Sequence, residues 1–235
     1  MNSFELTLES PAENLAFDEV LLHHQRSPVL RFWQPASYFV VLGYANRAAV
    51  EVRLPFCQAN AIPVLRRCTG GGTVLQGPGC LNYTLILPTD ASGPFHSISA
   101  TNQFIMRQHQ TALTELLKKP VAVEGCTDLT VDHRKFSGNA QRRSKDYLIF
   151  HGSFLLNFDL DLIERALPLP SQQPGYRARR AHTDFLSNLQ LEAESVMEAL
   201  AKAWNASATR LTVPNDVVKE LVAAKYQLDE WTFKY

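Results

Sequence analysis

Hydrophobic positions recur at helical spacing near the start of the chain. Ser10 is followed by Pro11 and then by Glu13, the arrangement of a capping box with proline at the first helical position. Phe17, Val20, Leu21 and His24 then fall on one helical face. The sequence therefore predicts a helix over residues 11–24.

Short runs with strand character follow, separated by prolines and glycines. We expect strands at residues 29–33, 38–42, 62–65 and 81–87. A long helix is predicted over residues 101–118, because two lysines that suit its negative end stand just before Pro120.

The second half of the chain returns to strands and then turns helical. The expected elements are strands at 121–123, 129–131 and 147–158, a short helix at 159–167, a loop at 168–180, and helices at 192–204 and 215–225. The strands come in groups without regular alternation with helices. This favours an α+β fold with a mixed or antiparallel sheet flanked by helices.

Composition narrows the class of protein. The chain has 235 residues, 46% of them hydrophobic, and 23 basic residues balance 23 acidic ones. Binding to nucleic acid or to a membrane surface requires a basic field, which this balance does not supply. No apolar run has the length of a membrane span, the start lacks a signal-peptide pattern, and the four cysteines form no C-x-x-C pair. We expect a cytoplasmic protein with reduced thiols that binds neither nucleic acid nor membrane.

A glycine-rich segment directly follows one predicted strand. It reads Arg66-Arg67-Cys68-Thr69-Gly70-Gly71-Gly72-Thr73. Glycines let a backbone approach a ligand closely, and exposed N–H groups beside arginines suit a phosphate or another anion. The spacing differs from both the P-loop and the dinucleotide-binding fingerprint. The alternative is a flexible hairpin turn.

Two later segments also carry candidate chemistry. A hairpin is predicted around residues 132–134, so that Lys135 begins the return strand toward Gly138. A lysine there can hold an anionic intermediate, although an isolated lysine is more often solvated. Gly152, which follows His151, stands in a strand where a backbone or ligand can come close.

Together these segments resemble the lipoate-protein ligase A family. The resemblance rests on Arg66-Arg67-x-Thr69-Gly70-Gly71-Gly72-Thr73-Val74, Gly79-x-Leu81-Asn82-Tyr83, Asp128-Leu129, Arg134-Lys135-x-Ser137-Gly138-x-Ala140-Gln141 and His151-Gly152-Ser153-Phe154-Leu155. It extends over about residues 14–189. It implies the catalytic-domain fold shared by lipoate and biotin protein ligases and octanoyltransferases, over residues 1–190, with residues 191–235 as a short helical segment packed on it.

The resemblance also implies an activity. Lipoate or octanoate would be activated by ATP and Mg²⁺ to acyl-AMP and transferred to a lysine of a carrier domain. Lys135 would be catalytic, contacting carbonyl and phosphate oxygens, and Asp128 would lie near the nucleotide and its Mg²⁺. The residues implied in substrate or cofactor binding are Arg67, Thr69, Gly70, Gly71, Gly72, Thr73, Asn82, Asp128, Gly138 and Gly152, with Asn82 bracing the glycine-rich loop.

The chain departs from the family pattern in two places. Gln76 stands where many members have histidine. Residues 191–235 are too few for the accessory domain of full-length ligases, so a separate accessory subunit is one expectation.

Two alternatives to the ligase remain. Octanoyltransferases of this fold carry the acyl group on a thiol without ATP, and Cys126 lies in that neighbourhood, although a packing role is favoured. The other alternative is a non-catalytic lipoate-binding subunit. The basic stretch Tyr176–His182 is either a solvated loop or, through Arg179 and Arg180, a docking site for an acidic carrier.

Overall fold

The fold is built on two β-sheets. The computed structural model describes residues 1–211 and 213–235. The larger sheet has eight strands in the order β11-β1-β2-β6-β10-β9-β8-β7, and the smaller has the order β4-β3-β5. In the larger sheet β1 is parallel to both neighbours and the other pairs are antiparallel, which confirms the predicted α+β fold with a mixed sheet. The strands are β1 (Asn2–Glu5), β2 (Val29–Trp33), β3 (Phe39–Leu42), β4 (Val64–Arg66), β5 (Val74–Gln76), β6 (Cys80–Pro88), β7 (Ala122–Glu124), β8 (Asp128–Val131), β9 (Arg134–Arg143), β10 (Tyr147–Leu155) and β11 (Ser207–Ala208).

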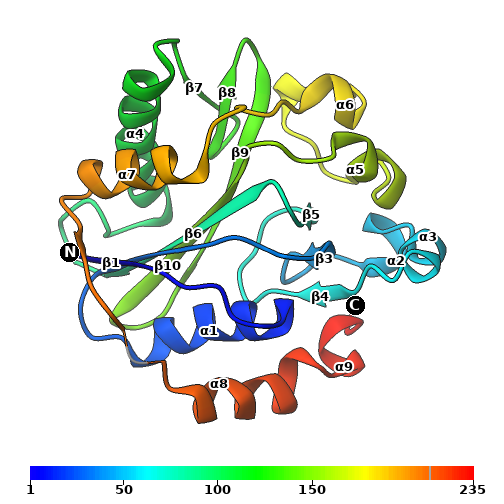
Figure 1. Ribbon diagram of the computed structural model, residues 1–235, viewed down its shortest axis with the longest axis horizontal. Helices are drawn as coiled ribbons and strands as arrows, with labels where there is room; N and C mark the ends of the chain where they lie inside the picture. Colours follow the sequence, from blue (N-terminus) through cyan, green and yellow to red (C-terminus); the bar gives the residue numbers. More distant parts are fainter. Residues whose placement is uncertain (212) are drawn as a thin grey trace.

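Helices cover both faces of the larger sheet (Figure 1). On one face lie α4 (Ile98–Leu117) and α7 (Ala193–Ala203), and on the other α1 (Pro11–His24) and α8 (Asn215–Leu221). Successive strand residues point to opposite faces. Accordingly, Leu85 packs into the core under α4 and α7, whereas its neighbour Ile86 packs against α1.

Helix α1 begins with the predicted capping box. The Ser10 hydroxyl accepts from Glu13 N at 3.2 Å, and the Glu13 carboxylate accepts from Ser10 N at 2.8 Å. The sequence predicted one buried apolar face for this helix, but all of residues 14–22 are buried, so the helix is buried on every side over this stretch. The reason is that α8 covers the side of α1 turned away from the sheet.

A third core cluster joins the smaller sheet to the remaining helices. Val40 and Leu75 of the small sheet pack with Ile163 and Phe185. Ile163 lies in α5 and Phe185 in α6, two of the short helices next to the smaller sheet in Figure 1. The short helical elements of this region, including one 3₁₀ turn in the predicted loop, are α2 (Ala48–Glu51), α3 (Leu54–Ala59), α5 (Leu160–Ala166), η1 (Gly175–Arg177) and α6 (His182–Phe185).

The end of the chain is attached to the glycine-rich segment. A π-helical turn η2 (Val222–Tyr226) leads to α9 (Asp229–Thr232). The fully buried Arg66 guanidinium donates to the carbonyls of Trp231 at 3.0 Å and Thr232 at 2.6 Å, and the Trp231 indole donates back to Arg66 O at 2.9 Å. The domain boundary at residue 190 stays a prediction.

Several short elements were not predicted, among them β1, β5, α2, α3, β11 and α9. Elements of two to six residues contain too few positions to display a period. Of the helices within residues 1–211 and 213–235, none has both the length and the apolar character needed to cross a bilayer.

Candidate active site

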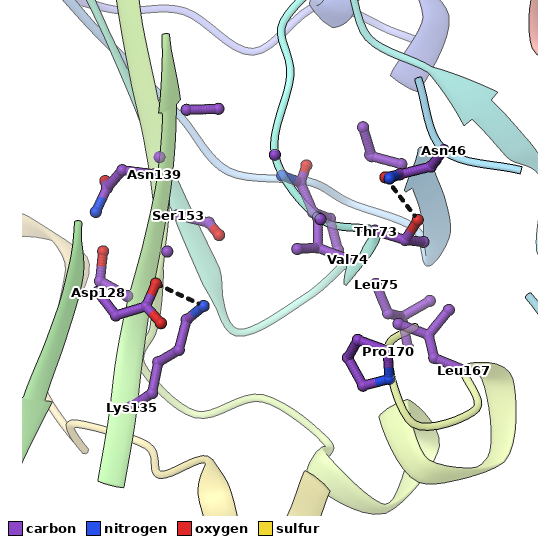
Figure 2. A pocket seen from close by; sticks show the side chains of 18 of the residues that line it. Asn46, Thr73, Val74, Leu75, Asp128, Lys135, Asn139, Ser153, Leu167 and Pro170 are labelled. Atoms are coloured by element: carbon purple, nitrogen blue, oxygen red, sulfur yellow. Dashed lines mark hydrogen bonds and ion pairs between the residues drawn. The ribbon is translucent and has the colours of Figure 1, made fainter. Parts of the chain in front are cut away.

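A cavity of about 830 Å³ lies between the larger sheet, the smaller sheet and the segment that follows α5. Figure 2 shows its two walls. Asp128, Lys135, Asn139 and Ser153 extend from β8, β9 and β10 on one side. The opposite wall carries apolar side chains, namely those of Val74, Leu75, Leu167 and Pro170. A ligand with a polar group and an aliphatic chain would find a matching surface for each.

In the glycine-rich loop, residues 70–73, the carbonyl groups of Gly70 and Gly72 face the Arg67 guanidinium. Arg67 Nη2 donates to Gly70 O at 2.5 Å and to Gly72 O at 2.8 Å. In a trans peptide the carbonyl and the next N–H point in opposite directions, so the amides of Gly71 and Thr73 point away from Arg67. Within the described residues, no acceptor takes a hydrogen bond from any amide of residues 70–73. The loop therefore presents free donors suited to an anion.

Arg67 is buried beneath the loop and also borders the cavity, and its direct contact with a ligand stays a prediction. Its side chain is bonded to loop carbonyls and to the Thr69 hydroxyl. Burial lowers the pKa of the Arg67 guanidinium to about 10, so the group keeps its charge at neutral pH. Its positive charge then adds to that of the free amides above it.

The three glycines differ in how much room their backbone leaves for a side chain. Gly71 has φ +86°, and a Cβ there would lie 2.9 Å from Arg67 Nη2. A Cβ on Gly70 or Gly72 would meet no atom within 4 Å. Gly71 therefore permits a backbone conformation that other residues rarely adopt, whereas Gly70 and Gly72 leave the surface of the loop open.

Lys135 forms an ion pair inside the cavity. Its Nζ lies 2.8 Å from Asp128 Oδ1, and the Tyr176 hydroxyl donates to Asp128 Oδ2 at 2.7 Å. Burial and the Asp128 charge raise the pKa of Tyr176 well above its ordinary value, so Tyr176 remains a donor. A Cβ on Gly138 would lie 2.8 Å from Lys135 Nζ, so the lysine side chain lies directly over this glycine.

The lysine and the loop approach the same face of β9. Lys135 Nζ lies over Gly138, and a Cβ on Gly71 would lie 3.5 Å from Ala140 Cβ. Residues two apart on a strand share a face and are about 6.6 Å apart. The two cationic elements are thus close enough to contact a single phosphate-bearing group.

The geometry around Asp128 bears on the predicted metal. Both carboxylate oxygens already have partners, Lys135 and Tyr176. No group of three or more His, Cys, Asp or Glu side chains able to hold a metal occurs in residues 1–211 and 213–235. Mg²⁺ is commonly held by one or two carboxylates together with substrate phosphates. Asp128 as a Mg²⁺ ligand stays a prediction.

Asn82 and Gln76 bond to one another. Asn82 Nδ2 donates to Gln76 Oε1 of β5 at 3.1 Å. Bracing of the glycine-rich loop by Asn82 stays a prediction. The loop is held at its other end by Thr73, whose hydroxyl donates to Asn46 Oδ1 at 3.1 Å.

Gly152 lies beneath a second polar side chain of the cavity. A Cβ there would collide with Asn139 Oδ1. Asn139 Oδ1 accepts from the Tyr83 hydroxyl at 2.5 Å, and Asn139 Nδ2 donates to Thr127 O at 2.5 Å. Gly152 is therefore needed to seat Asn139.

The basic stretch is only partly solvated. Arg177 is buried with its guanidinium 4.5 Å from the centre of the Phe185 ring, so a fully solvated loop is the wrong description. Arg179 is exposed and Arg180 is half-buried. A role for these two arginines in carrier docking stays a prediction.

The four cysteines differ in accessibility. Cys57, Cys68 and Cys80 are buried, and burial raises the pKa of Cys68 to about 11 and that of Cys80 to about 12. Cys126 is exposed and borders the cavity.

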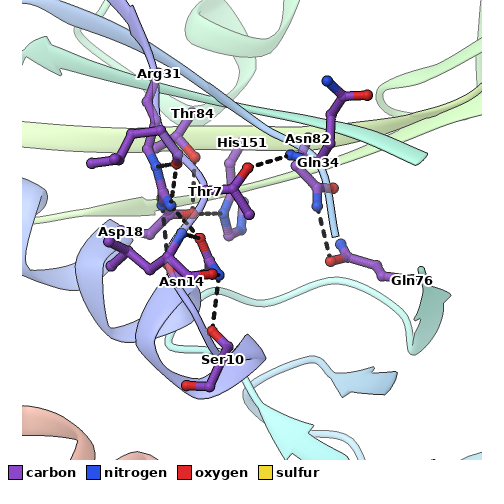
Figure 3. A network of polar contacts seen from close by, with 12 residues as sticks. Thr7, Ser10, Asn14, Asp18, Arg31, Gln34, Gln76, Asn82, Thr84 and His151 are labelled. Carbon is purple, nitrogen blue, oxygen red and sulfur yellow. Dashed lines mark hydrogen bonds and ion pairs between the residues drawn. The ribbon is translucent and has the colours of Figure 1, made fainter. Parts of the chain in front are cut away.

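A buried polar network beneath the loop escaped the sequence analysis (Figure 3). Asp18 of α1 accepts from Arg31 Nη1 at 2.6 Å and from the Thr84 hydroxyl at 2.8 Å, and contacts His151 Nδ1 at 3.1 Å. Burial opposes ionisation of Asp18, but the Arg31 charge and two hydrogen bonds outweigh it, so the pKa of Asp18 lies below its ordinary value. The signal available in the sequence was a charged residue within an otherwise apolar element, namely Asp18 in α1 and Arg31 in β2.

A family model described as the lipoyl protein ligase A/B catalytic domain matches residues 10–205. The chain belongs to this family. The resemblance found in the motifs is thereby confirmed. The match includes the smaller sheet, the glycine-rich loop and all strands of the larger sheet except β1 and β11.

Relatives in this family carry two kinds of name. Octanoyltransferase LipM of Brevibacillus brevis is 27% identical, with 96% of this chain and 95% of that protein covered. Lipoate-protein ligase A subunit 1 of Thermoplasma acidophilum is 26% identical, with 96% and 94% covered. Lipoate–protein ligase 1 of Staphylococcus aureus is 29% identical over 83% of this chain but only 60% of its own length. Both names denote enzymes, which confirms that this chain is a member of an enzyme family of ligases and transferases acting in lipoylation.

Solved structures agree on the fold. A lipoate-protein ligase A bound with ATP superposes with a TM-score of 0.83 at 23% identity, covering 99% of both chains. A bi-partite lipoate protein ligase from Thermoplasma acidophilum, described with its E2 lipoyl domain, gives the same TM-score at 23% identity over 99% of this chain and 96% of that one. These likenesses confirm the lipoate-ligase catalytic-domain fold.

Proposed function

We propose that this protein is a lipoate-protein ligase that uses ATP to activate lipoate or octanoate and transfers the acyl group to a lysine of a carrier domain. The observation that carries the proposal is the loop of residues 70–73. The carbonyls of Gly70 and Gly72 are bonded to Arg67, the amides of the loop are free among the described residues, and Lys135 approaches the same face of β9.

The first proposed step builds the acyl-AMP. A carboxylate oxygen of the fatty acid attacks the α-phosphorus of ATP, an O–P bond forms, and the bond to pyrophosphate breaks. Negative charge grows on the α-phosphate in this step, so prearranged N–H donors and a lysine lower its free energy. Mg²⁺, when bound, would neutralise charge on the departing pyrophosphate. Asp128 is the residue proposed to hold it, in exchange for one of its present contacts with Lys135 and Tyr176.

The second proposed step uses the same donors. The amine of the carrier lysine attacks the acyl carbonyl and the C–N bond forms. The bond between the carbonyl carbon and the AMP oxygen breaks, AMP leaves, and the proton lost by the amine passes to water. Lys135 stabilises the oxygen on which charge develops. Holding the anhydride beside the incoming amine supplies most of the remaining acceleration.

A single mixture tests the proposal. The protein is incubated with lipoate, ATP, Mg²⁺ and a lipoyl carrier domain, and the carrier is weighed by mass spectrometry. A mass increase equal to one lipoyl group that depends on ATP is the expected result. Carrier that stays unmodified while free lipoyl-AMP accumulates would assign the transfer step to a separate accessory subunit. No lipoyl-AMP and no modified carrier would refute the proposal.

A second candidate function is transfer of an octanoyl group between carriers without ATP. The exposure of Cys126 at the cavity edge and the relatives named octanoyltransferase support it. Its signature is an acyl-thioester on Cys126, formed from octanoyl-carrier without ATP and located by peptide mass spectrometry. We favour the ligase because the loop amides and Lys135 address a phosphate, which an acyl-thioester exchange does not contain.

The acceptor is proposed to be a separate carrier protein. One relative is named a ligase subunit, and one similar structure is described as bi-partite with an E2 lipoyl domain. Exposed Arg179 and half-buried Arg180 would meet an acidic carrier surface. Charge reversal at Arg179 should then slow carrier modification more at low than at high ionic strength.

A further inference from the structure

A continuous chain of hydrogen bonds joins α1 to the glycine-rich loop through the interior. Asp18 Oδ2 lies 3.1 Å from His151 Nδ1, and His151 Nε2 lies 2.7 Å from Thr69 Oγ1. The Thr69 hydroxyl in turn accepts from Arg67 Nε at 3.0 Å. Thr69 has no exposed surface, and Asp18 has only 2%. Figure 3 shows His151 directed toward Asp18 from the neighbouring sheet.

The hydrogen-bond partners define where the imidazole carries its proton. Asp18 already accepts from Arg31 and Thr84 and is an ionised acceptor, so His151 Nδ1 must donate to it. Thr69 Oγ1 accepts from Arg67, and its own proton then needs an acceptor. Within the network that acceptor is His151 Nε2. This hydrogen-bond pattern assigns the donor role of the imidazole to Nδ1 and the acceptor role to Nε2.

We propose that His151 is a positioning residue for the glycine-rich loop. In the neutral form it orients the Thr69 hydroxyl to receive Arg67 Nε, and Arg67 then binds Gly70 O and Gly72 O. The free amides of the loop depend on this arrangement. His151 borders the cavity itself, but its proposed effect on the affinity of the loop for an acyl-phosphate ligand acts through Thr69 and Arg67. The inference rests on the proposed function, because it assumes that the loop binds such a ligand.

Protonation of His151 would break the chain at one point. A second N–H, on Nε2, would then point at the Thr69 oxygen that already accepts from Arg67, and the Thr69 proton would lose its acceptor. The charged groups next to His151 in this chain of contacts are Asp18 of α1, which meets Nδ1, and Arg31 of β2 and Arg67, each of which is reached through one hydrogen-bonded neighbour. Strand β6 contributes the neutral Thr84.

The test measures affinity for a non-hydrolysable lipoyl-adenylate analogue by calorimetry between about pH 5 and about pH 8, the range in which histidine titrates. Wild-type affinity is expected to fall on acidification. Thr69→Val should weaken binding about fivefold to tenfold at the upper pH, the usual effect of one lost neutral hydrogen bond. It should also remove the acid-dependent part of the affinity, and Thr69→Ser should restore both the affinity and its pH dependence.

The outcomes separate the two proposals. A wild-type protein that binds no analogue at any pH overturns the proposed function. A wild-type protein that binds, combined with a Thr69→Val variant of unchanged affinity and pH dependence, overturns the role of His151 alone. If Thr69→Val does not fold, ¹⁵N NMR of the wild-type imidazole decides. A proton on Nδ1 at neutral pH is expected, and a proton on Nε2 would contradict the inference.

Discussion

Replacing Lys135 by alanine is the most direct test of the candidate site. The side chain is 24% exposed, and its Nζ pairs with Asp128 at 2.8 Å beside Gly138. Its removal deletes a cation from the part of the cavity where charge would develop on both the carbonyl and the α-phosphate. Loss of one such transition-state donor costs about 3 kcal/mol, equivalent to a fall of about 100-fold in rate.

The same substitution should barely affect folding. An ion pair this close to solvent contributes at most about 1 kcal/mol, and Asp128 keeps the hydrogen bond from Tyr176. In a protein of this size 1 kcal/mol corresponds to about 2–4 °C in melting temperature. We therefore expect a large loss of activity with a small thermal shift.

The assay pairs carrier lipoylation, followed by mass spectrometry, with the melting temperature of the same preparation. A matched control is Lys202→Ala, because Lys202 pairs with Glu115 at 3.4 Å on the exposed surface of α7, outside the cavity. The control should match wild type in both measurements. Near wild-type lipoylation by Lys135→Ala at an unchanged melting temperature would refute the assigned role.

Three further changes test the surrounding geometry. Gly71→Ala should weaken binding of the adenylate analogue and cost about 1–2 kcal/mol of strain at φ +86°, whereas Gly70→Ala should fold normally; equal melting curves for the two would contradict this. Because the pKa of Asp18 is lowered in the folded protein, Asp18 contributes to stability above about pH 4, and this contribution is lost as the pH falls through the folded pKa. Arg31→Met should lower the free energy of unfolding in urea by about 3–5 kcal/mol and should shift the acid-induced loss of stability to higher pH. Cys126→Ala should keep most ATP-dependent lipoylation, and an inactive but folded variant would favour the thiol-dependent transferase.

Local signals in the sequence were sufficient for the long elements. The capping box of Ser10 and Glu13 specified the start of α1, because both partners lie within one helical turn. Prolines and glycines marked the strand ends near the loop, and grouped strands indicated the α+β class. The order of the motifs was sufficient to recognise the family, which the match over residues 10–205 confirms.

The partners of the site residues came only from the tertiary structure. Strands β2, β6 and β10 are neighbours, and their register places Arg31, Thr84 and His151 in one row. Asp18 of α1 lies over this row and links it to Thr69. Asp18 and His151 are 133 positions apart in sequence. A residue pattern reports periodicity within one element, whereas contacts of this separation depend on strand order and register.

The glycine-rich loop illustrates the division between the two levels. The sequence by itself determined that the chain can approach an anion there, because Gly70 to Gly72 carry no side chains. Only the tertiary structure decided which way the peptide groups face. Arg67 is buried below the loop and binds the carbonyls of Gly70 and Gly72, so the free amides remain for a ligand. The peptide groups face this way because the buried Arg67 guanidinium needs hydrogen-bond acceptors, and the carbonyls of Gly70 and Gly72 supply them.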